Sequence, residues 1–79
     1  MSAVNITIIE DEEDISHLLV YNLKKEGYSV SAHESGEEGL AAIRADPPDL
    51  VLLDLMLPGM DGMDVCRSMK QDPATQGIP

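Results

Sequence analysis

The feature that most constrains the fold is an uninterrupted apolar run, Leu50-Val51-Leu52-Leu53, that ends in a single carboxylate, Asp54. Asp46-Pro47-Pro48 precedes this run, and a loop rich in proline and glycine follows it over residues 58–62. Short apolar runs bounded by turn residues are typical of strands buried on both faces of a parallel sheet. Asp54 is then expected where the strand leaves the sheet at its carboxyl end, the edge at which open α/β sheets bind ligands.

Patterns typical of strands and helices alternate along the rest of the chain. Apolar and β-branched residues predict a strand over residues 4–9, and alternating small and apolar residues predict another over residues 28–32. Helical spacing predicts three helices, carried by Ile15, Leu18, Leu19 and Leu23 in the first, Leu40, Ala41 and Ile43 in the second, and Val65, Cys66 and Met69 in the third. Gly27 is expected to end the first helix, and Ser35 with Glu38 to form a capping box for the second. Strand and helix thus alternate three times, which predicts a parallel sheet covered by helices.

Length and charge narrow the function classes. With 79 residues the chain has room for one small domain. A net charge of −10 argues against nonspecific binding to nucleic acids or anionic membranes and favours a metal ion or a basic partner. Cys66 is the only cysteine, which excludes an internal disulfide framework and suits a reducing compartment. No apolar run reaches the roughly 18 residues of a membrane span, so a cytoplasmic domain is expected.

Carboxylates follow two of the predicted strands. Glu10 and Asp11 come directly after the first strand, and Asp54 comes after the third. If these two strands are neighbours, their backbones lie about 4.8 Å apart and the three carboxylates converge. Such a group is stable when a divalent cation neutralises it, and Mg²⁺ combines one or two carboxylates with water and phosphate oxygens. The pattern therefore favours phosphoryl chemistry, with Asp54 as a metal ligand or a nucleophile.

Simpler interpretations stay open at this point. Acidic residues before a helix are commonly solvated charges that favour the helix dipole, and an aspartate at a strand end is a common turn former. The remaining polar and nucleophilic residues are expected to be structural: Asp61, Asp64, His17, His33 and Cys66. No phosphate-binding or dinucleotide-binding glycine motif is present, so nucleotide binding is unsupported.

Two segments together resemble a known family. Ile8-Ile9-Glu10-Asp11-Glu12 and the run over residues 52–62 (LLDLMLPGMDG) are similar to the receiver domain of two-component response regulators. Within that family they are most similar to winged-helix (OmpR/PhoB-like) transcriptional regulators. The resemblance implies a flavodoxin-like, CheY-like, doubly wound parallel sheet with strand order 2-1-3-4-5, of which this chain holds 2-1-3.

The resemblance also implies roles for individual residues. Asp54 would be the phosphoacceptor, taking a phosphoryl group from a sensor histidine kinase or a small phosphodonor. Asp11, Asp54 and the backbone carbonyl of Met56 would bind Mg²⁺, and Glu10 would do so directly or through water. The domain would be a regulatory module rather than an enzyme, and it would control a DNA-binding output domain outside this chain. This segment itself would contact neither nucleic acid nor membrane.

Residues 1–79 are expected to form only the N-terminal portion of such a domain. Strands four and five and helices four and five would be absent, and with them the Ser/Thr and the Lys that respond to phosphorylation in the family. The third strand would then be an exposed apolar edge, which is a template for pairing with another chain. We therefore expect self-association through this strand or through exchanged elements.

Two other functions remain to be compared. The chain could be an interaction or dimerisation fragment that binds a divalent cation but does not complete phosphotransfer. It could also resemble a phosphatase that works through an aspartyl-phosphate. Such enzymes carry a second aspartate two residues after the first. Met56 stands at that position, which argues against the phosphatase.

Overall fold

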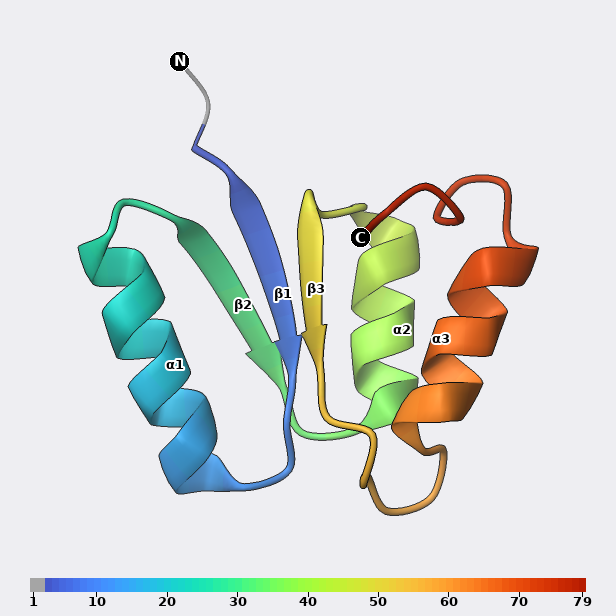
Figure 1. Cartoon of the computed structure of the whole chain (residues 1–79), viewed down its shortest axis with the longest axis horizontal. Coiled ribbons are helices and arrows are strands. Elements are labelled where there is room, and N and C mark those ends of the chain that lie inside the picture. The colour runs from blue at the N-terminus through green and yellow to red at the C-terminus, as the bar shows by residue number, and fades with distance from the viewer. Residues whose placement is uncertain (1–2) are drawn as a thin grey trace.

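A computed structural model describes residues 3–79 as three parallel strands alternating with three helices (Figure 1). The elements are β1 (Asn5–Ile9), α1 (Glu13–Lys25), β2 (Ser29–His33), α2 (Gly36–Ala45), β3 (Leu50–Leu53) and α3 (Gly62–Gln71). The strand order is β2-β1-β3, and both pairings are parallel. The predicted architecture, three βα units of a CheY-like flavodoxin fold in the order 2-1-3, is thus confirmed.

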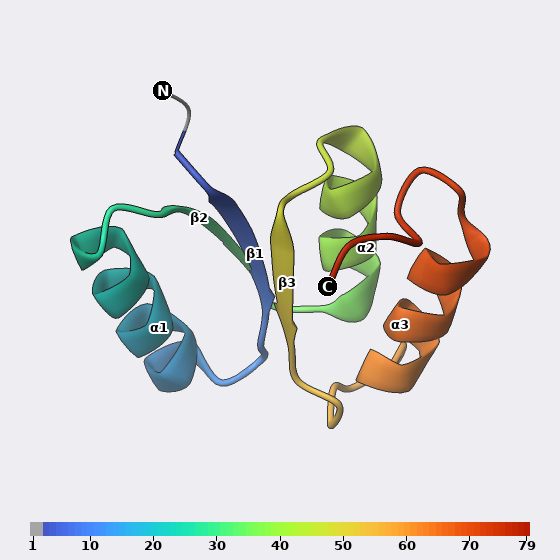
Figure 2. The same cartoon turned by 45° about the horizontal axis from the view of Figure 1, so that its top comes forward.

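The helices cover the two faces of the sheet unequally. α1 lies on one face, and α2 and α3 lie together on the other (Figure 2). The main core fills the space between the sheet and this second pair, and its buried members are Ile9, Leu40, Ile43, Leu57, Val65 and Met69. Within residues 3–79, none of the helices is long and apolar enough to cross a membrane.

Element boundaries follow the predicted patterns closely. β1 begins at Asn5 rather than at residue 4, and β2 is displaced by one residue, running to His33. Gly27, with φ of +95°, follows the end of α1 as expected. At the start of α2 the Ser35 hydroxyl accepts the Glu38 N–H at 3.1 Å, which is the first half of the predicted capping box.

The stripe predicted for the first helix is only partly buried. Leu19 and Leu23 are half-buried, but Ile15 is 46% and Leu18 is 62% exposed. The reason is the placement of α1, which packs mainly against β2 at one edge of the sheet (Figure 1). Residues on its far side therefore have no neighbouring element to contact.

The third strand differs from the expectation of burial on both faces. All four residues of β3 are half-buried. β3 forms the edge of the sheet opposite β2, so only one of its sides is paired with β1. The apolar sequence of Leu50–Leu53 is that of a central strand, but its position in this chain is that of an edge strand, as the expectation of an exposed edge requires.

Candidate functional site

The site begins where β1 and β3 end side by side. Ile9 is paired with Leu53, so Glu10 and Asp54 follow at the same edge of the sheet. The Asp54 N–H donates to the Ile9 carbonyl at 3.0 Å, which continues the ladder by one residue. On the other side of β1, the Glu10 N–H donates to the His33 carbonyl at 3.0 Å. The backbone of both carboxylate residues is therefore fixed by the sheet.

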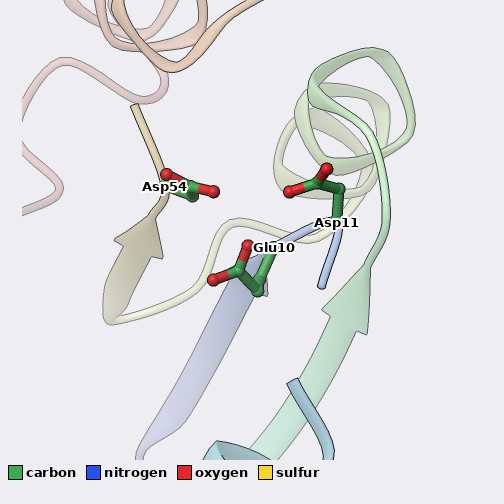
Figure 3. A group of neighbouring side chains, drawn as sticks. All are labelled: Glu10, Asp11 and Asp54. Carbon is green, nitrogen blue, oxygen red and sulfur yellow. The ribbon is translucent and has the colours of Figure 1, made fainter. Parts of the chain in front are cut away.

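Three carboxylates converge at this edge. Glu10, Asp11 and Asp54 each offer an oxygen, and these oxygens all lie within 4.8 Å of one another. Figure 3 shows the three side chains around a common space, two from the end of β1 and one from the end of β3. Glu10 and Asp54 are half-buried and Asp11 is exposed. The convergence that the sequence predicted is thus present.

Backbone N–H groups orient two of these carboxylates. Asp54 Oδ1 accepts the Met56 N–H at 2.9 Å, and Glu10 Oε2 accepts the Glu12 N–H at 3.3 Å. The Met56 side chain is 85% exposed, so only its backbone takes part in the site. The resemblance to receiver domains implied the Met56 carbonyl as a metal ligand, and that role stays a prediction. Its N–H bond to Asp54 was not foreseen, because it depends on the turn that the chain makes after β3.

The environment separates the proton affinities of Glu10 and Asp54. Burial, together with the hydrogen bond and negative charge of Asp54, raises the pKa of the Glu10 carboxyl. The Met56 N–H, followed by the hydrogen bond with Glu10, lowers the pKa of Asp54. A proton shared by the pair therefore resides on Glu10. Asp54 stays ionised, which is the form that a metal ligand or a nucleophile requires.

The loop after Asp54 is held closely against the start of α3. The Gly62 N–H donates to the Leu55 carbonyl at 3.3 Å, and a Cβ at Gly62 would overlap the Asp54 carbonyl oxygen and the Leu55 Cα. Asp61 and Asp64 form a reciprocal capping box, each side chain accepting the other residue's N–H. Their structural interpretation is confirmed. The need for glycine at residue 62 was not predicted, because it arises from contact between two backbone segments.

The other residues considered from the sequence lie outside this cluster. His17 pairs with Glu13 at 3.8 Å on the exposed face of α1. The His33 ring lies 3.4 Å from the Ser31 hydroxyl on β2, and Cys66 is half-buried on α3. In the part of the chain that the structure describes, Glu10, Asp11 and Asp54 form the only group of three or more such side chains close enough to share a metal ion.

The donor set fits a small, hard divalent cation. Mg²⁺ binds oxygens at about 2.1 Å, which places opposite ligands about 4.2 Å apart. The spread of the three carboxylate oxygens, within 4.8 Å, needs only small side-chain movements to reach that geometry. The three ligands are all oxygens, without a sulfur or nitrogen donor, which is the set that Mg²⁺ prefers.

Comparisons with known proteins agree with this geometry. Residues 6–79 match the family model described as the response regulator receiver domain. The chain is 44% identical to the N-terminal domain of a response regulator receiver protein from Methanoculleus marisnigri, covering 99% of this chain and 63% of that structure, with a TM-score of 0.93. It is 32% identical to the signal receiver domain of a signal transduction histidine kinase from Syntrophus aciditrophicus, covering 98% of this chain and 58% of that one, with a TM-score of 0.92.

A third structure was solved with ligands. The response regulator protein TrrA from Thermotoga maritima, in complex with Mg(2+)-BeF, is 35% identical over 86% of this chain and 59% of its own, with a TM-score of 0.83. The chain spans less than two thirds of the length of each of these structures. The family model nevertheless covers nearly all of residues 3–79. The chain belongs to the response regulator receiver domain family.

Proposed function

We propose that this chain is the phosphoacceptor part of a two-component response regulator and that Asp54 accepts the phosphoryl group. The donor is the phosphohistidine of a sensor histidine kinase or a small phosphodonor. Asp11, Asp54 and the Met56 carbonyl would hold Mg²⁺, with Glu10 binding it directly or through water, and the ion would offset negative charge on the transferred group. The observation that carries this proposal is the convergence of three carboxylates at one strand edge in a chain of the receiver family.

The transfer itself needs little from the protein beyond position and charge. An Asp54 carboxylate oxygen attacks phosphorus in line, the new P–O bond forms, and the P–N bond of phosphohistidine breaks. The electron pair of that bond returns to the imidazole, which takes up a proton. The Met56 N–H fixes the orientation of Asp54 before the reaction, and the lowered pKa of Asp54 keeps it ionised.

The setting of the module belongs to the same proposal. The module is regulatory, works in the cytoplasm, and controls a transcriptional output domain outside this chain. The relation to winged-helix regulators stays a prediction from the residues around Asp54. We also propose that residues 1–79 are the N-terminal portion of a longer receiver domain. This is supported by the partial coverage of the matched structures.

The test uses a small phosphodonor with Mg²⁺, followed by intact-mass and peptide mass spectrometry. We expect one phosphoryl group per chain, on Asp54, and none in Asp54→Asn. Asp14→Asn is the matched control, because it removes the same charge from the exposed first turn of α1 and should be labelled normally. Beryllium fluoride with Mg²⁺ should give an adduct with the same dependence on Asp54. A label on another residue would refute the assignment.

The alternative is a fragment that binds a divalent cation without completing phosphotransfer. Within residues 3–79, the ion pairs all lie outside the cluster, so none of them gives Asp54 a cationic partner. Mg²⁺ binding that depends on Asp11 and Asp54, with no transfer and no beryllium fluoride adduct, would favour this alternative. An adduct only in a longer chain would show that further residues are required.

A further inference from the structure

The loop that follows Asp54 (residues 55–61) is packed against the start of α2. Leu57, in the middle of the loop, is 6% exposed and belongs to the main core together with residues of α2 and α3. Gly36, the first residue of α2, is buried, and Figure 1 shows this end of the helix close to the loop that leaves β3. The path of the loop therefore depends on α2, an element that contributes no side chain to the carboxylate cluster.

Gly36 and the loop approach each other so closely that no side chain fits between them. A Cβ at residue 36 would lie 2.5 Å from the Met60 carbonyl oxygen and 2.9 Å from Val65 Cγ2. The nearer of these atoms belongs to the backbone of the loop, so it cannot turn aside as the end of a side chain can. Alanine is a better helix former than glycine. Contact with the loop, and not helix propensity, therefore favours glycine at residue 36.

The helix has less freedom to move than the loop. Further along the first turn of α2, a Cβ at Gly39 would overlap the Ile9 side chain, so the helix lies directly against β1. Leu40 and Ile43 of the same helix are buried in the main core, and moving them would open close-packed apolar contacts. A displacement that begins at Gly36 is therefore expected to fall on the loop.

The backbone that would be displaced is the one that serves the site. Met60 lies in the same loop as Met56, whose N–H donates to Asp54 Oδ1 at 2.9 Å. The Leu55 and Met56 side chains are 53% and 85% exposed, so packing does little to fix this end of the loop. We propose that Gly36 is a positioning residue, whose close approach fixes the loop so that the Met56 backbone meets Asp54. The consequence for phosphoryl transfer rests on the proposed function, whereas the contact and the hydrogen bond do not.

The first test is the amide hydrogen exchange of Met56, measured by nuclear magnetic resonance. Gly36→Ala should accelerate this exchange by about tenfold, the effect of losing roughly one hydrogen bond. Ser35→Ala is the matched control, because it removes the cap of the same helical turn without placing an atom between α2 and the loop. It should leave the exchange of Met56 near that of the intact chain. An unchanged rate in Gly36→Ala, or equal acceleration in both variants, would overturn the proposal.

A measurement on the intact chain keeps the proposal testable even if Gly36→Ala folds poorly. In a Mg²⁺ titration, the amide signals of Met56 and Gly36 should shift with the same midpoint, because the loop transmits a change at the site to the start of α2. The amide signal of Ala45, at the other end of α2, should stay in place. A Gly36 signal that does not move while that of Met56 shifts would contradict the proposal.

Phosphoryl labelling separates this inference from the proposed function. With a small phosphodonor and Mg²⁺, Asp54 should be labelled about 10- to 100-fold more slowly in Gly36→Ala than in the intact chain, because small misplacements of reacting groups cost up to about 10² in rate. Ser35→Ala should be labelled at the rate of the intact chain. Equal rates in Gly36→Ala and the intact chain would refute the positioning role. No label in any of the three chains would refute the proposed function, while the exchange of Met56 would still decide whether Gly36 positions the loop.

Discussion

Asp54 and Asp11 are held at the site in different ways. Asp54 is half-buried, its N–H is bonded to Ile9, and its carboxylate accepts the Met56 N–H. Asp11 is exposed at the start of the turn that leads to α1. In the proposed function, this difference suits Asp54 to act as a fixed nucleophile and Asp11 to supply mainly negative charge and a ligand oxygen.

Removal of the Asp11 charge should weaken cation binding without unfolding the chain. We expect Asp11→Asn to lower Mg²⁺ affinity by at least about 10- to 100-fold, because that is the loss when a group that only supports a metal ligand is changed, and Asp11 is proposed as a ligand itself. Isothermal titration calorimetry measures the effect. Asp14→Asn removes an equal charge from the first turn of α1 and should change the affinity by less than about threefold, because solvent screens an exposed charge. Equal losses in both variants would show that net charge, and not the cluster, binds the cation.

The sequence was sufficient to predict the cluster of three carboxylates, but not the backbone contacts that hold it in place. Glu10, Asp11 and Asp54 could be predicted because each follows a strand, and parallel neighbours bring such residues to one edge. The Met56 N–H bond and the close approach of Gly62 depend on the path of the loop after β3. That path is set by contacts with α3, and local propensity alone does not determine it.

At the scale of helices and strands, local signals determine where an element ends, whereas neighbouring elements determine how deeply it is buried. The helix ends at Gly27 and Ser35 were predicted because each residue satisfies local backbone groups. The exposure of Ile15 and Leu18 was not predicted. Periodicity shows which face of a helix is apolar, but it does not show whether another element covers that face. β3 shows the same limit, since its apolar sequence indicated full burial and its edge position leaves it half-buried.

The start of α3 is expected to depend on its capping box. Asp61→Ala removes an acceptor for the Asp64 N–H and leaves the first turn with an unpaired donor. We expect the free energy of unfolding to fall by about 1 kcal/mol. Urea denaturation followed by circular dichroism measures this change.

Met63→Ala serves as the control for this prediction. Met63 lies in the same turn of α3 but is 52% exposed, so its truncation should change the stability by less than about 0.5 kcal/mol. A similar loss in both variants would indicate that the helix start is sensitive to any change, rather than to the cap.

For the whole molecule, two features act against each other. The free edge of β3 and the exposed apolar residues of α1 favour association, whereas the net charge of −10 keeps identical copies apart. Along that edge the Val51 N–H donates to the Pro79 carbonyl at 3.1 Å, which occupies one of the outward N–H groups of β3. The balance should therefore respond to ionic strength.

Self-association of the intact chain is expected at concentrations on the order of tens of micromolar, and it should strengthen as salt is added. Salt screens the repulsion between acidic surfaces. It does not weaken association through the apolar edge, and some salts strengthen the burial of apolar surface. Sedimentation equilibrium at low and high sodium chloride measures both effects. A dispersed monomer under all these conditions would contradict the prediction, and association that weakens with salt would point to an ionic interface instead.

The exposed side chain of Met56 also makes the site accessible to spectroscopy. The chain contains no tryptophan, and its two tyrosines, Tyr21 and Tyr28, lie on and just after α1. Met56→Trp would place a single indole in solvent beside the carboxylates, and it would keep the N–H that Asp54 accepts, since that group belongs to the backbone. Its fluorescence emission should change on addition of Mg²⁺, and Asp11→Asn should shift that response to higher concentrations. The fluorescence of this indole would then measure cation binding at the carboxylate cluster.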